Sequence, residues 1–479
     1  MNASLMMTNP ELEFMRSVTA PDSASMPNSA VMAWIHERRS AVGASITQVS
    51  LDCLRRWRRD AATGNLVHDS GRFFSIEGIR VDTDWGGVPH WEQPIINQAE
   101  IGYLGLLAKK VDGVLHVLVQ AKIEPGNINV VQVSPTLQAT KSNYSQVHQG
   151  KRPRYLEYFN GERKAMLLLD QLQSEQGARF LRKRNRNMIV ELPPGEDIEA
   201  HPDFLWMSIG QIKRLMRKDN VVNMDTRTVL SGIGYGTYAA DTLEGLYTLA
   251  PTSQKQRLMM NSALGAKHAH NDFRNIISWL TGLKSRHDLV VERIPLNRIA
   301  GWNDVDGVIS RTDGKYFSVI GVNVTIENRE VVNWDQPMIR PAQEGLIAFI
   351  VRPINGSYHF LVQAELEAGN FDIVELAPTV QCLTGNYRVG SNEYSVKYIN
   401  DVLNAPPEKI LFDSMQSEEG GRFFHEQNRN LIVEVGDEFP LEVGEHYCWM
   451  TLNQILRLIE FNNYLNIAAR SLISAITFD

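Results

Sequence analysis

Alternation of apolar and polar residues predicts the same series of strands twice along this chain. The first series contains FFSIEGIRV at residues 73–81 and YLGLLAKKVDGVLHVLVQAKIE at residues 103–124. The second contains YFSVIGVNV at residues 316–324 and GLIAFIVRPINGSYHFLVQAELE at residues 345–367. Asp112-Gly113 and Asn355-Gly356 interrupt the longer runs, and such dipeptides between β-rich runs strongly indicate hairpins.

Segments whose apolar residues recur at helical spacing lie before and after these strands. We expect helices over Val31–Arg39 and Ile46–Asp60, and over the segment NDFRNIISWLTGL at residues 271–283. Each series also contains a polar segment, starting at Gln173 or Gln416, that is predicted as a helix followed by a strand. Each series closes with a predicted amphipathic helix. Its expected N-cap is Ser208 in the segment WMSIGQ of the first series and Thr451 in the matching segment WMTLNQ of the second.

The two series are copies of one domain. Val117–Tyr144 returns as Phe360–Tyr387 at an offset of 243, with 13 of 28 residues identical. We therefore predict an α+β fold made by tandem duplication, each copy a mixed sheet flanked by helices, with the copies related by a pseudo-two-fold axis. The expected division is a flexible tail (1–30), a first repeat (31–225), a linker (226–270) and a second repeat (271–479).

Composition narrows the class of protein. A net charge of −7 with a pI near 6.0 argues against nucleic acid as a partner. Three cysteines without a CxxC pair indicate neither a disulfide framework nor a zinc site. With no bilayer-length apolar run and no signal-peptide pattern at the N-terminus, the expected location is the cytoplasm, away from membranes.

Two polar segments kept in register are candidate ligand sites. Pro135–Tyr144 and its partner Pro378–Tyr387 follow an apolar strand and retain Thr, Gln, Asn and Tyr. These groups can bind a ligand, or they can tie down their own loop. In the second segment, a glycine turn followed by Arg179 or Arg422 suits an anion at a helix start, although a structural ion pair fits equally well.

Other residues offer further chemistry. Trp57 and Trp302 precede equivalent strands and could stack on a base or sugar, or anchor the core. His148 occurs in one copy only and could act as an acid or base. Carboxylates kept in both copies are also possible bases; they are Glu124, Glu367, Glu175 and Glu418. The sequence contains no dinucleotide-binding GxGxxG, HExxH or GxSxG motif, so we expect no metal and no cofactor.

The paired segments SPTLQATKSNYSQVHQG and ELAPTVQCLTGNYR, together with QSEEGGRF and NRN, resemble the NDP-hexose 2,3-dehydratase family over nearly the whole chain. The resemblance implies loss of water across C2 and C3 of a dTDP-4-keto-6-deoxyhexose, in deoxysugar biosynthesis. It further implies Nudix-like repeats without an intact Nudix box, a homodimer, and a product handed to a keto-sugar reductase.

The resemblance also implies a set of residues around the substrate. Those residues are Trp57, Thr140, Lys141, Ser142, Asn143, Tyr144, Trp302, Thr379, Val380, Gln381, Cys382, Gly385, Asn386, Tyr387, Glu419, Gly420, Gly421 and Arg422, with Arg179 added as the equivalent of Arg422. The acid and base remain open among Tyr387, Tyr144, His148 and Glu418. A keto-sugar epimerase or isomerase and a non-catalytic nucleotide-sugar-binding protein are the alternative functions.

Overall fold

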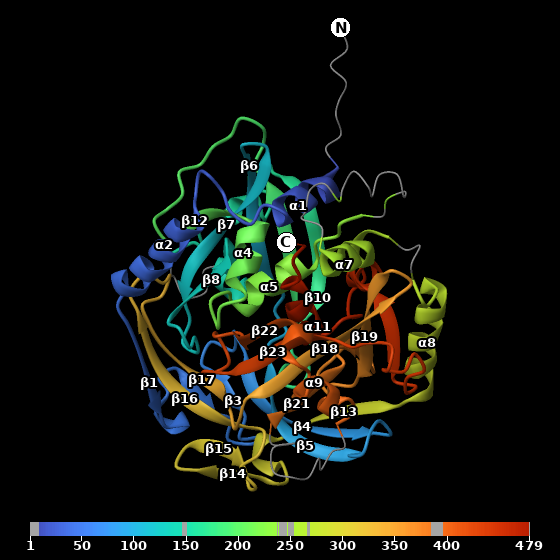
Figure 1. The fold of residues 1–479 in the computed structure, drawn as a ribbon. Helices are drawn as coiled ribbons and strands as arrows, with labels where there is room; N and C mark the ends of the chain where they lie inside the picture. The colour runs from blue at the N-terminus through green and yellow to red at the C-terminus, as the bar shows by residue number, and fades with distance from the viewer. Residues whose placement is uncertain are drawn as a thin grey trace.

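The chain folds as two similar halves joined through their sheets (Figure 1). The computed structural model describes residues 9–145, 151–236, 238, 247, 253–265, 269–384 and 396–478. In each half, the described residues form a seven-stranded mixed sheet, a smaller sheet and several helices. The predicted α+β class with two similar halves is thereby confirmed.

Equivalent elements follow in the same order in both halves. The first half contains α1 (Pro10–Val18), α2 (Asn28–Ala41), β1 (Ala44–Val49), η1 (Leu51–Cys53), β2 (Trp57–Arg59), β3 (Leu66–His68), β4 (Ser75–Thr83), β5 (His90–Asn97), β6 (Gly102–Val111), β7 (Val114–Ile123), β8 (Val131–Pro135), β9 (Leu137–Ala139), α3 (Lys141–Tyr144), η2 (Leu156–Tyr158), β10 (Met166–Ser174), β11 (Arg184–Glu191), β12 (Phe204–Ser208), α4 (Ile209–Leu215) and α5 (Met224–Ser231). The second contains α7 (Gln254–Leu264), α8 (Phe273–Arg286), β13 (Leu289–Ile294), η5 (Leu296–Arg298), β14 (Trp302–Val305), β15 (Val308–Arg311), β16 (Phe317–Ile326), β17 (Asn333–Pro341), β18 (Gly345–Ile354), β19 (Ser357–Glu365), β20 (Glu375–Ala377), β21 (Val380–Leu383), α9 (Ile399–Leu403), η7 (Pro407–Lys409), β22 (Ile410–Ser417), β23 (Gln427–Glu434), β24 (Tyr447–Thr451), α10 (Leu452–Ile459) and α11 (Ile467–Ser474).

The two seven-stranded sheets have the same topology. The first runs β10-β11-β6-β7-β12, with β8 on β7 and β9 on β6. The second runs β22-β23-β18-β19-β24, with β20 on β19 and β21 on β18. In each sheet one pair is parallel, β11 with β6 or β23 with β18, and the other pairs are antiparallel. The hairpins predicted at Asp112-Gly113 and Asn355-Gly356 join the central strands.

The smaller sheets exchange their edge strands. β1 from the start of the chain pairs with β16 of the second half, from Ala44↔Ile326 to Val49↔Gly321. Reciprocally, β13 pairs with β4 of the first half, from Leu289↔Thr83 to Ile294↔Gly78. Figure 1 shows blue β1 beside the much later β16, and β13 beside β4 and β5. Each small sheet therefore contains a strand from the opposite half.

Each smaller sheet also packs against the main sheet of the other half. Ile123, at the end of β7, lies in one buried cluster with Val322 of β16. Ile79 of β4 lies in a second cluster with Ala368, which follows β19. Burial of this apolar surface stabilises the joined halves and leaves neither half with a complete core of its own.

A reciprocal pair of buried arginines joins the halves at their centre, where α5 and α11 meet (Figure 1). Arg227 of α5 donates to the Ser417 carbonyl and, at 2.8 Å, to Ser471 Oγ. Arg470 of α11 donates to the carbonyl of Ser174, the residue equivalent to Ser417. Burial lowers the pKa of both guanidinium groups to about 10, so both stay protonated at neutral pH. Buried cations require such partners, and these contacts therefore fix how the halves sit together.

The predicted N-caps are confirmed, but three predicted helices are wrong: those over Ile46–Asp60 and at the segments that start at Gln173 and Gln416. Ser208 and Thr451 each form a capping box at the start of α4 and α10. Ile46–Asp60 instead forms β1, η1 and β2, because its apolar residues pair with or pack on the distant second half. The segment from Gln173 continues β10, turns, and enters β11, with Gln173 opposite Asn185. Local periodicity does not reveal such long-range pairing.

The chain ends of the repeats also differ from the predicted boundaries. Residues 10–18 of the expected flexible tail form α1, whose Phe14, Met15 and Val18 are buried. Its Ser17 hydroxyl donates to the Leu115 carbonyl, and Ser262 of α7 makes the equivalent bond to the Tyr358 carbonyl. All of α7 and most of α5 lie in the expected linker, yet residues of both helices are part of the main hydrophobic core. We therefore propose that the duplicated unit begins before residue 31.

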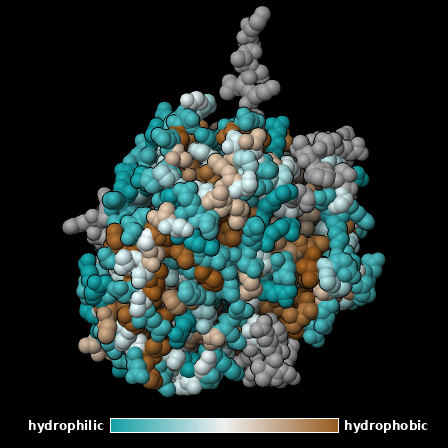
Figure 2. Space-filling model, turned by 60° about the vertical axis from the view of Figure 1, so that its left-hand side comes forward, coloured by the Kyte–Doolittle hydropathy of each residue, from teal (hydrophilic) through white to brown (hydrophobic). Residues whose placement is uncertain are grey.

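Hydrophilic side chains cover most of the face shown in Figure 2, and hydrophobic ones lie among them in groups. Across the part of the chain that the structure describes, every helix is too short or too polar to cross a bilayer.

Gly126 and its equivalent Gly369 allow the halves to approach closely, which yields a stability prediction. A Cβ on Gly126 would lie 1.7 Å from the Phe423 carbonyl oxygen, and one on Gly369 would lie 1.8 Å from that of Phe180. Gly126→Ala should lower the free energy of unfolding by about 3 kcal/mol, because the obstacle is backbone across the contact. Gly87→Ala, with open space around its Cβ, should change it by less than about 0.5 kcal/mol. Denaturant titration of both variants tests this; equal stabilities would contradict it.

Candidate functional site

A pocket opens between the main sheet of the first half and the small sheet of the second. Its walls come from β2, β3, β6, β7, β9, β11 and β17, from the residues before β4, from the β16–β17 connection, and from the loop after β22. The residues that line it are Trp57, His68, Phe73, Phe74, Gln98, Gly102, Tyr103, Leu104, Lys122, Glu124, Pro125, Gln138, Ala139, Thr140, Asn143, Lys151, Glu175, Phe180, Lys183, Asn185, Asp225, Arg329, Glu330, Val331, Trp334, Asp335, Gln336, Glu419, Gly421 and Arg422. Because both halves contribute, the pocket depends on the reciprocal packing described above.

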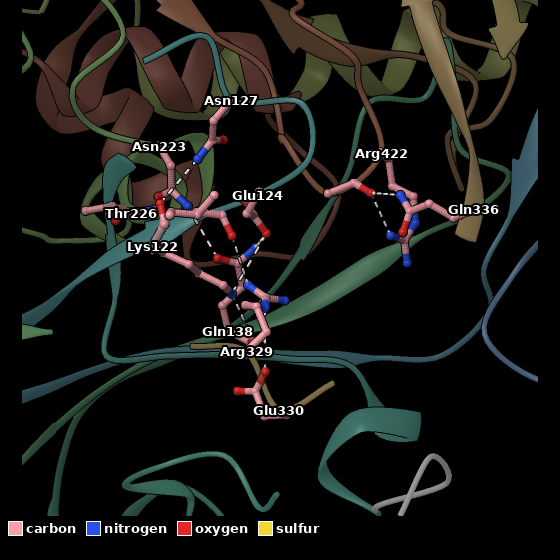
Figure 3. A network of polar contacts seen from close by, with 12 residues as sticks. Lys122, Glu124, Asn127, Gln138, Asn223, Thr226, Arg329, Glu330, Gln336 and Arg422 are labelled. Carbon is pink, nitrogen blue, oxygen red and sulfur yellow. Dashed lines mark hydrogen bonds and ion pairs between the residues drawn. The ribbon is translucent and has the colours of Figure 1, made fainter. Parts of the chain in front are cut away.

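One charged group of the pocket lies where β7 ends. Lys122 Nζ is 3.8 Å from Glu124 Oε1 and 3.4 Å from the Gln138 carbonyl oxygen. The Gln138 amide donates to the same Glu124 oxygen at 2.9 Å and accepts from Asn223 Nδ2 at 3.3 Å. Figure 3 shows Lys122, Glu124 and Gln138 converging, with Arg329 beside them. Burial lowers the pKa of Lys122, and the neighbouring cation of Arg329 lowers it further.

The second half supplies an ion pair to this group. Arg329 and Glu330, on the connection from β16 to β17, are 3.6 Å apart between Nε and Oε2. Burial raises the pKa of the Glu330 carboxyl, but the charges of Arg329 and Lys122 outweigh burial and hold it below its ordinary value. Glu330 is therefore an anion at neutral pH and partly balances the two cations.

A second charged group lies on the side of the pocket formed by β11 and the loop after β22. Lys183 donates to the Glu100 carbonyl, and burial lowers its pKa to about 8. Glu175 accepts from Asn185 Nδ2 at 2.7 Å. Burial raises the pKa of Glu419 to about 7. Lys183 and Glu419 can therefore both gain or lose a proton near neutral pH and exchange it with a bound molecule.

Arg422 is the buried cation on the aromatic side of the pocket. Its guanidinium lies 4.2 Å from the centre of the Phe74 ring and donates to Gln98 Oε1 at 3.2 Å. Gln336 steadies the loop by donating to the Gly421 carbonyl at 2.6 Å, as Figure 3 shows. The sequence-based prediction of a helix start before Arg422 is wrong, since the segment is a turn between β22 and β23. The arginine itself nevertheless faces the pocket.

Asp225, in the first turn of α5, is a further acidic residue that lines the pocket. Its side chain is buried, and its pKa is raised well above the ordinary range by burial and by the nearby carboxylates of Glu419, Glu175 and Glu124. Burial and the nearby carboxylates therefore favour the protonated form of Asp225, which can donate a hydrogen bond.

Comparison of the two halves separates shared residues from those specific to this pocket. At the offset of 243, the shared pairs include Glu124/Glu367, Gln138/Gln381, Glu175/Glu418 and Arg422/Arg179. Charged residues of the pocket that change include Lys122 to Glu365, Lys183 to Glu426, Asp225 to Ala468, Arg329 to Gly86, Glu330 to Gly87 and, in the reverse direction, Glu419 to Gln176. All six first-named residues line the one pocket. The pocket therefore differs in charge from the equivalent region of the other half.

The equivalent region of the second half has a different electrostatic character. Burial raises the pKa of Glu365 to about 8 and that of Glu426 to about 7. Where the first half presents two lysines, the second presents two carboxyl groups that titrate near neutrality. An anionic ligand is therefore favoured by the first-half pocket and disfavoured by its counterpart.

The residues of the predicted loop 135–144 lie in different places in the structure. Thr140 and Asn143 line the pocket. Ser142 is buried and bonded to Glu100 through its amide, at 2.9 Å, and its hydroxyl. Lys141 and Tyr144 line a separate hollow beside Arg186, Tyr103 and Glu100. Burial raises the pKa of Tyr144, so this phenol is a neutral donor at physiological pH.

The equivalent residues of the second half have structural partners. The Thr379 hydroxyl accepts from the Ile350 amide at 2.9 Å and donates to the Leu361 carbonyl. Gln381 donates to Glu367 at 2.9 Å and accepts from Asn466 at 2.8 Å. Val380 is buried, and burial raises the pKa of the Cys382 thiol to about 12. These contacts favour a structural role for Thr379–Cys382.

Both tryptophans join the halves. Trp57 donates from Nε1 to the Asp335 carbonyl at 2.7 Å, and Trp302 donates to the Glu92 carbonyl at 2.9 Å. Both pack in the same buried cluster, but Trp57 also lines the pocket. The core-anchor interpretation therefore applies to both, and only Trp57 is also placed to contact a ligand.

Several candidates lie elsewhere. His148 and Gly385–Tyr387 fall outside the described residues. Glu418 is buried against Asn428 and Gln176, at 2.5 and 2.6 Å. Gly420 packs against Asn127 at the junction of the halves, and Arg179 covers the Phe317 ring at 4.3 Å.

The pocket charges that sequence reasoning missed are Lys122, Lys183, Asp225, Arg329 and Glu330. The sequence held a usable signal for them, since each changes in charge or type at the equivalent position. In the part of the chain that the structure describes, no three His, Cys, Asp or Glu side chains are grouped as metal ligands.

The buried carboxyl groups of the second half predict how stability depends on pH. The folded pKa values of Glu365 and Glu426, about 8 and about 7, exceed the ordinary 4.5. The folded state then binds more protons than the unfolded state between pH 4.5 and 8, so stability should fall as the pH rises through that window. Glu365→Gln should reduce this fall. Unfolding titrations near the two ends of the window test it; an unchanged slope would contradict the assignment.

Comparisons with known proteins place the chain in a family. The family model described as NDP-hexose 2,3-dehydratase matches residues 28–233 and 273–476, one match in each half. Three relatives are each described as dTDP-4-dehydro-6-deoxy-alpha-D-glucopyranose 2,3-dehydratase. Those from Saccharopolyspora spinosa and Streptomyces violaceoruber are 43% and 45% identical, over 98% and 93% of this chain and 95% and 96% of theirs. The Amycolatopsis orientalis relative is 41% identical over 96% of this chain and 92% of its own. The chain therefore belongs to the NDP-hexose 2,3-dehydratase family.

Proposed function

We propose that this protein removes water across C2 and C3 of dTDP-4-keto-6-deoxy-D-glucose and releases a dTDP-3,4-diketo-2,6-dideoxyhexose. Membership of the family and the names of the three relatives support the reaction class and the substrate. The observation that carries the location of the site is the set of six charged residues that line one pocket and are replaced in the other half.

The reaction requires proton transfers and stabilisation of a negative charge. The 4-keto group acidifies the proton on C3, and its removal gives an enolate. Departure of the C2 hydroxyl then forms a C2–C3 double bond, and the resulting enol ketonises to the 3,4-dione. Positioned acids, bases and cations in a site sheltered from water serve each of these steps.

The pocket offers two separate regions for the two ends of such a substrate. We place the diphosphate near Arg422 and Lys183, because buried cations suit a multiply charged anion. Trp57 and Phe74 lie on the same side as Arg422 and provide aromatic surface for the base. The hexose would then lie toward Lys122 and Glu124, at the end of β7.

Two alternatives use the same pocket. A keto-sugar epimerase would form the same enolate but retain every oxygen, and a nucleotide-sugar-binding protein would bind without turnover. The expected homodimer, Nudix-like repeats, reductase partner and cytoplasmic location remain predictions, as do the absence of a cofactor and of a metal. The shared mixed-sheet topology of the halves supports a common ancestral domain.

Substrate turnover is the direct test of the proposed reaction. With substrate deuterated at C3, the product should lack both the deuterium and one oxygen, since C3 becomes a carbonyl and C2 loses its hydroxyl. A keto-sugar reductase or a dione-trapping reagent captures the product for mass spectrometry. A product that keeps all its oxygens would favour the epimerase, and unchanged substrate under conditions that permit binding would favour the binding protein.

A matched pair of arginine variants tests the location of the site. Arg422→Ala should weaken dTDP binding by about 1.5–3 kcal/mol, the range for a hydrogen bond to a charged group. Arg179→Ala alters the equivalent residue, which belongs to the first half and lies over the Phe317 ring of the second half. Calorimetric titration of both folded variants decides between the two equivalent regions: a loss of affinity confined to Arg179→Ala would place nucleotide binding in the region around Arg179 and contradict the proposal.

A further inference from the structure

Glu124 and Glu367 occupy equivalent positions but have different hydrogen bonds. In the second half, Glu367 Oε2 accepts from the Gly177 amide at 3.0 Å, and Oε1 accepts from Gln381 at 2.9 Å. Both oxygens of Glu367 thus have partners, and Oε2 bonds across the junction of the halves. In the first half, Glu124 Oε1 keeps the equivalent bond to Gln138 at 2.9 Å, but Oε2 is buried without a hydrogen-bond partner among the described residues.

The lysine at the end of β7 accounts for part of this difference. Lys122 Nζ lies 3.8 Å from Glu124 Oε1 and draws the carboxylate toward the pocket. The equivalent of Lys122 is Glu365, which brings no cation to Glu367. A buried carboxylate oxygen without a partner is costly. Since Glu124 is 5% exposed and lines the pocket, its free oxygen is a position prepared for a group of a bound molecule.

We propose that Glu124 is the catalytic base that removes the proton from C3, and that Lys122 is the cation that stabilises the enolate oxygen on C4. This assignment rests on the proposed dehydration. Glu124 has what the role requires: a free, buried oxygen that faces the pocket, an orienting bond from Gln138 to the other oxygen, and a neighbouring ammonium group. Gln138 is a positioning residue, and Asn223 in turn orients its amide at 3.3 Å.

The proposed steps balance in atoms and electrons. Glu124 Oε2 takes the C3 proton, and the C–H electron pair forms the C3–C4 double bond of the enolate, whose oxygen faces the Lys122 ammonium. The enolate then returns its electrons to form the C2–C3 double bond as the C2–O bond breaks. The protonated Glu124 passes its proton to the departing hydroxide, which leaves as water. The enol loses its O3 proton to solvent and gains one at C2 from solvent, and Glu124 is again a carboxylate.

The other charged groups near this pair have different surroundings. Asp225, Arg329 and Glu330 line the same part of the pocket, but burial disfavours the charged form of Asp225 and Glu330 is paired with Arg329. Glu175 also has a buried oxygen without a partner among the described residues, yet it lies with Lys183 on the side that we assign to the diphosphate. Glu124 is therefore the carboxylate with both a free oxygen and a place at the hexose end.

Glutamine substitutions at the two equivalent positions test the assignment. Glu124→Gln keeps the side-chain shape and should lower kcat at least about 100-fold, the lower end for general acid–base catalysis. It should leave the affinity for dTDP within about twofold. Substrate deuterated at C3 and recovered from this variant should keep its label. The matched variant Glu367→Gln should keep kcat within about threefold, since Glu367 does not line the pocket and the glutamine keeps its shape.

A second pair separates the base from the cation. Lys122→Gln should slow both water loss and C3 exchange, because both pass through the enolate, and Glu365→Gln should slow neither. Thermal unfolding checks that each variant is folded. A Glu124→Gln variant that turns over within threefold of the parent protein, or that releases the C3 label at the parent rate, would overturn the assignment. Absence of water loss by the parent protein would instead overturn the proposed function.

Discussion

The reciprocal packing of each small sheet on the opposite main sheet is the constraint on which the rest of this structure depends. It requires β1 and β13 to cross between the halves, and it brings the β16–β17 connection over the end of β7. Arg227 and Arg470 hold the same arrangement at the centre, each bonded to the carbonyl of a serine in the other half. The pocket is thus a property of the joined halves, because Lys122 and Lys183 come from one half and Arg329 and Arg422 come from the other.

The two halves use one backbone design for different purposes. Shared residues such as Gln138 and Gln381 make the same hydrogen bond to a glutamate in each half. Exchange of Lys122 for Glu365 changes what that glutamate can do, since one carboxylate lies beside a cation and the other beside a second carboxyl group. The difference in chemistry therefore arises from the residues placed on the strands and loops, with the topology left intact.

The duplication and the local signals could be predicted from the sequence, and the joining of the halves could not. The turns at Asp112 and Asn355 and the caps at Ser208 and Thr451 depend on neighbouring residues, and the structure confirms them. The prediction of a helix over Ile46–Asp60 was wrong because the strand that begins this segment pairs with residues more than 250 positions away. For the same reason, the family resemblance could name the loop around Thr140 but not the convergence of Lys122 with Arg329, which only the folded chain brings together.

The crossed strands also bear on how such a protein can arise. Two separate, identical copies of the repeat, exchanging their edge strands, would form the same contacts as a symmetric dimer. In that dimer any substitution appears twice, so a lysine that favours one pocket is imposed on the other. Fusion of the copies into one chain removes this restriction, because Lys122 and Glu365 are then encoded separately. The covalent link therefore allows the two equivalent regions to differ in charge within one molecule.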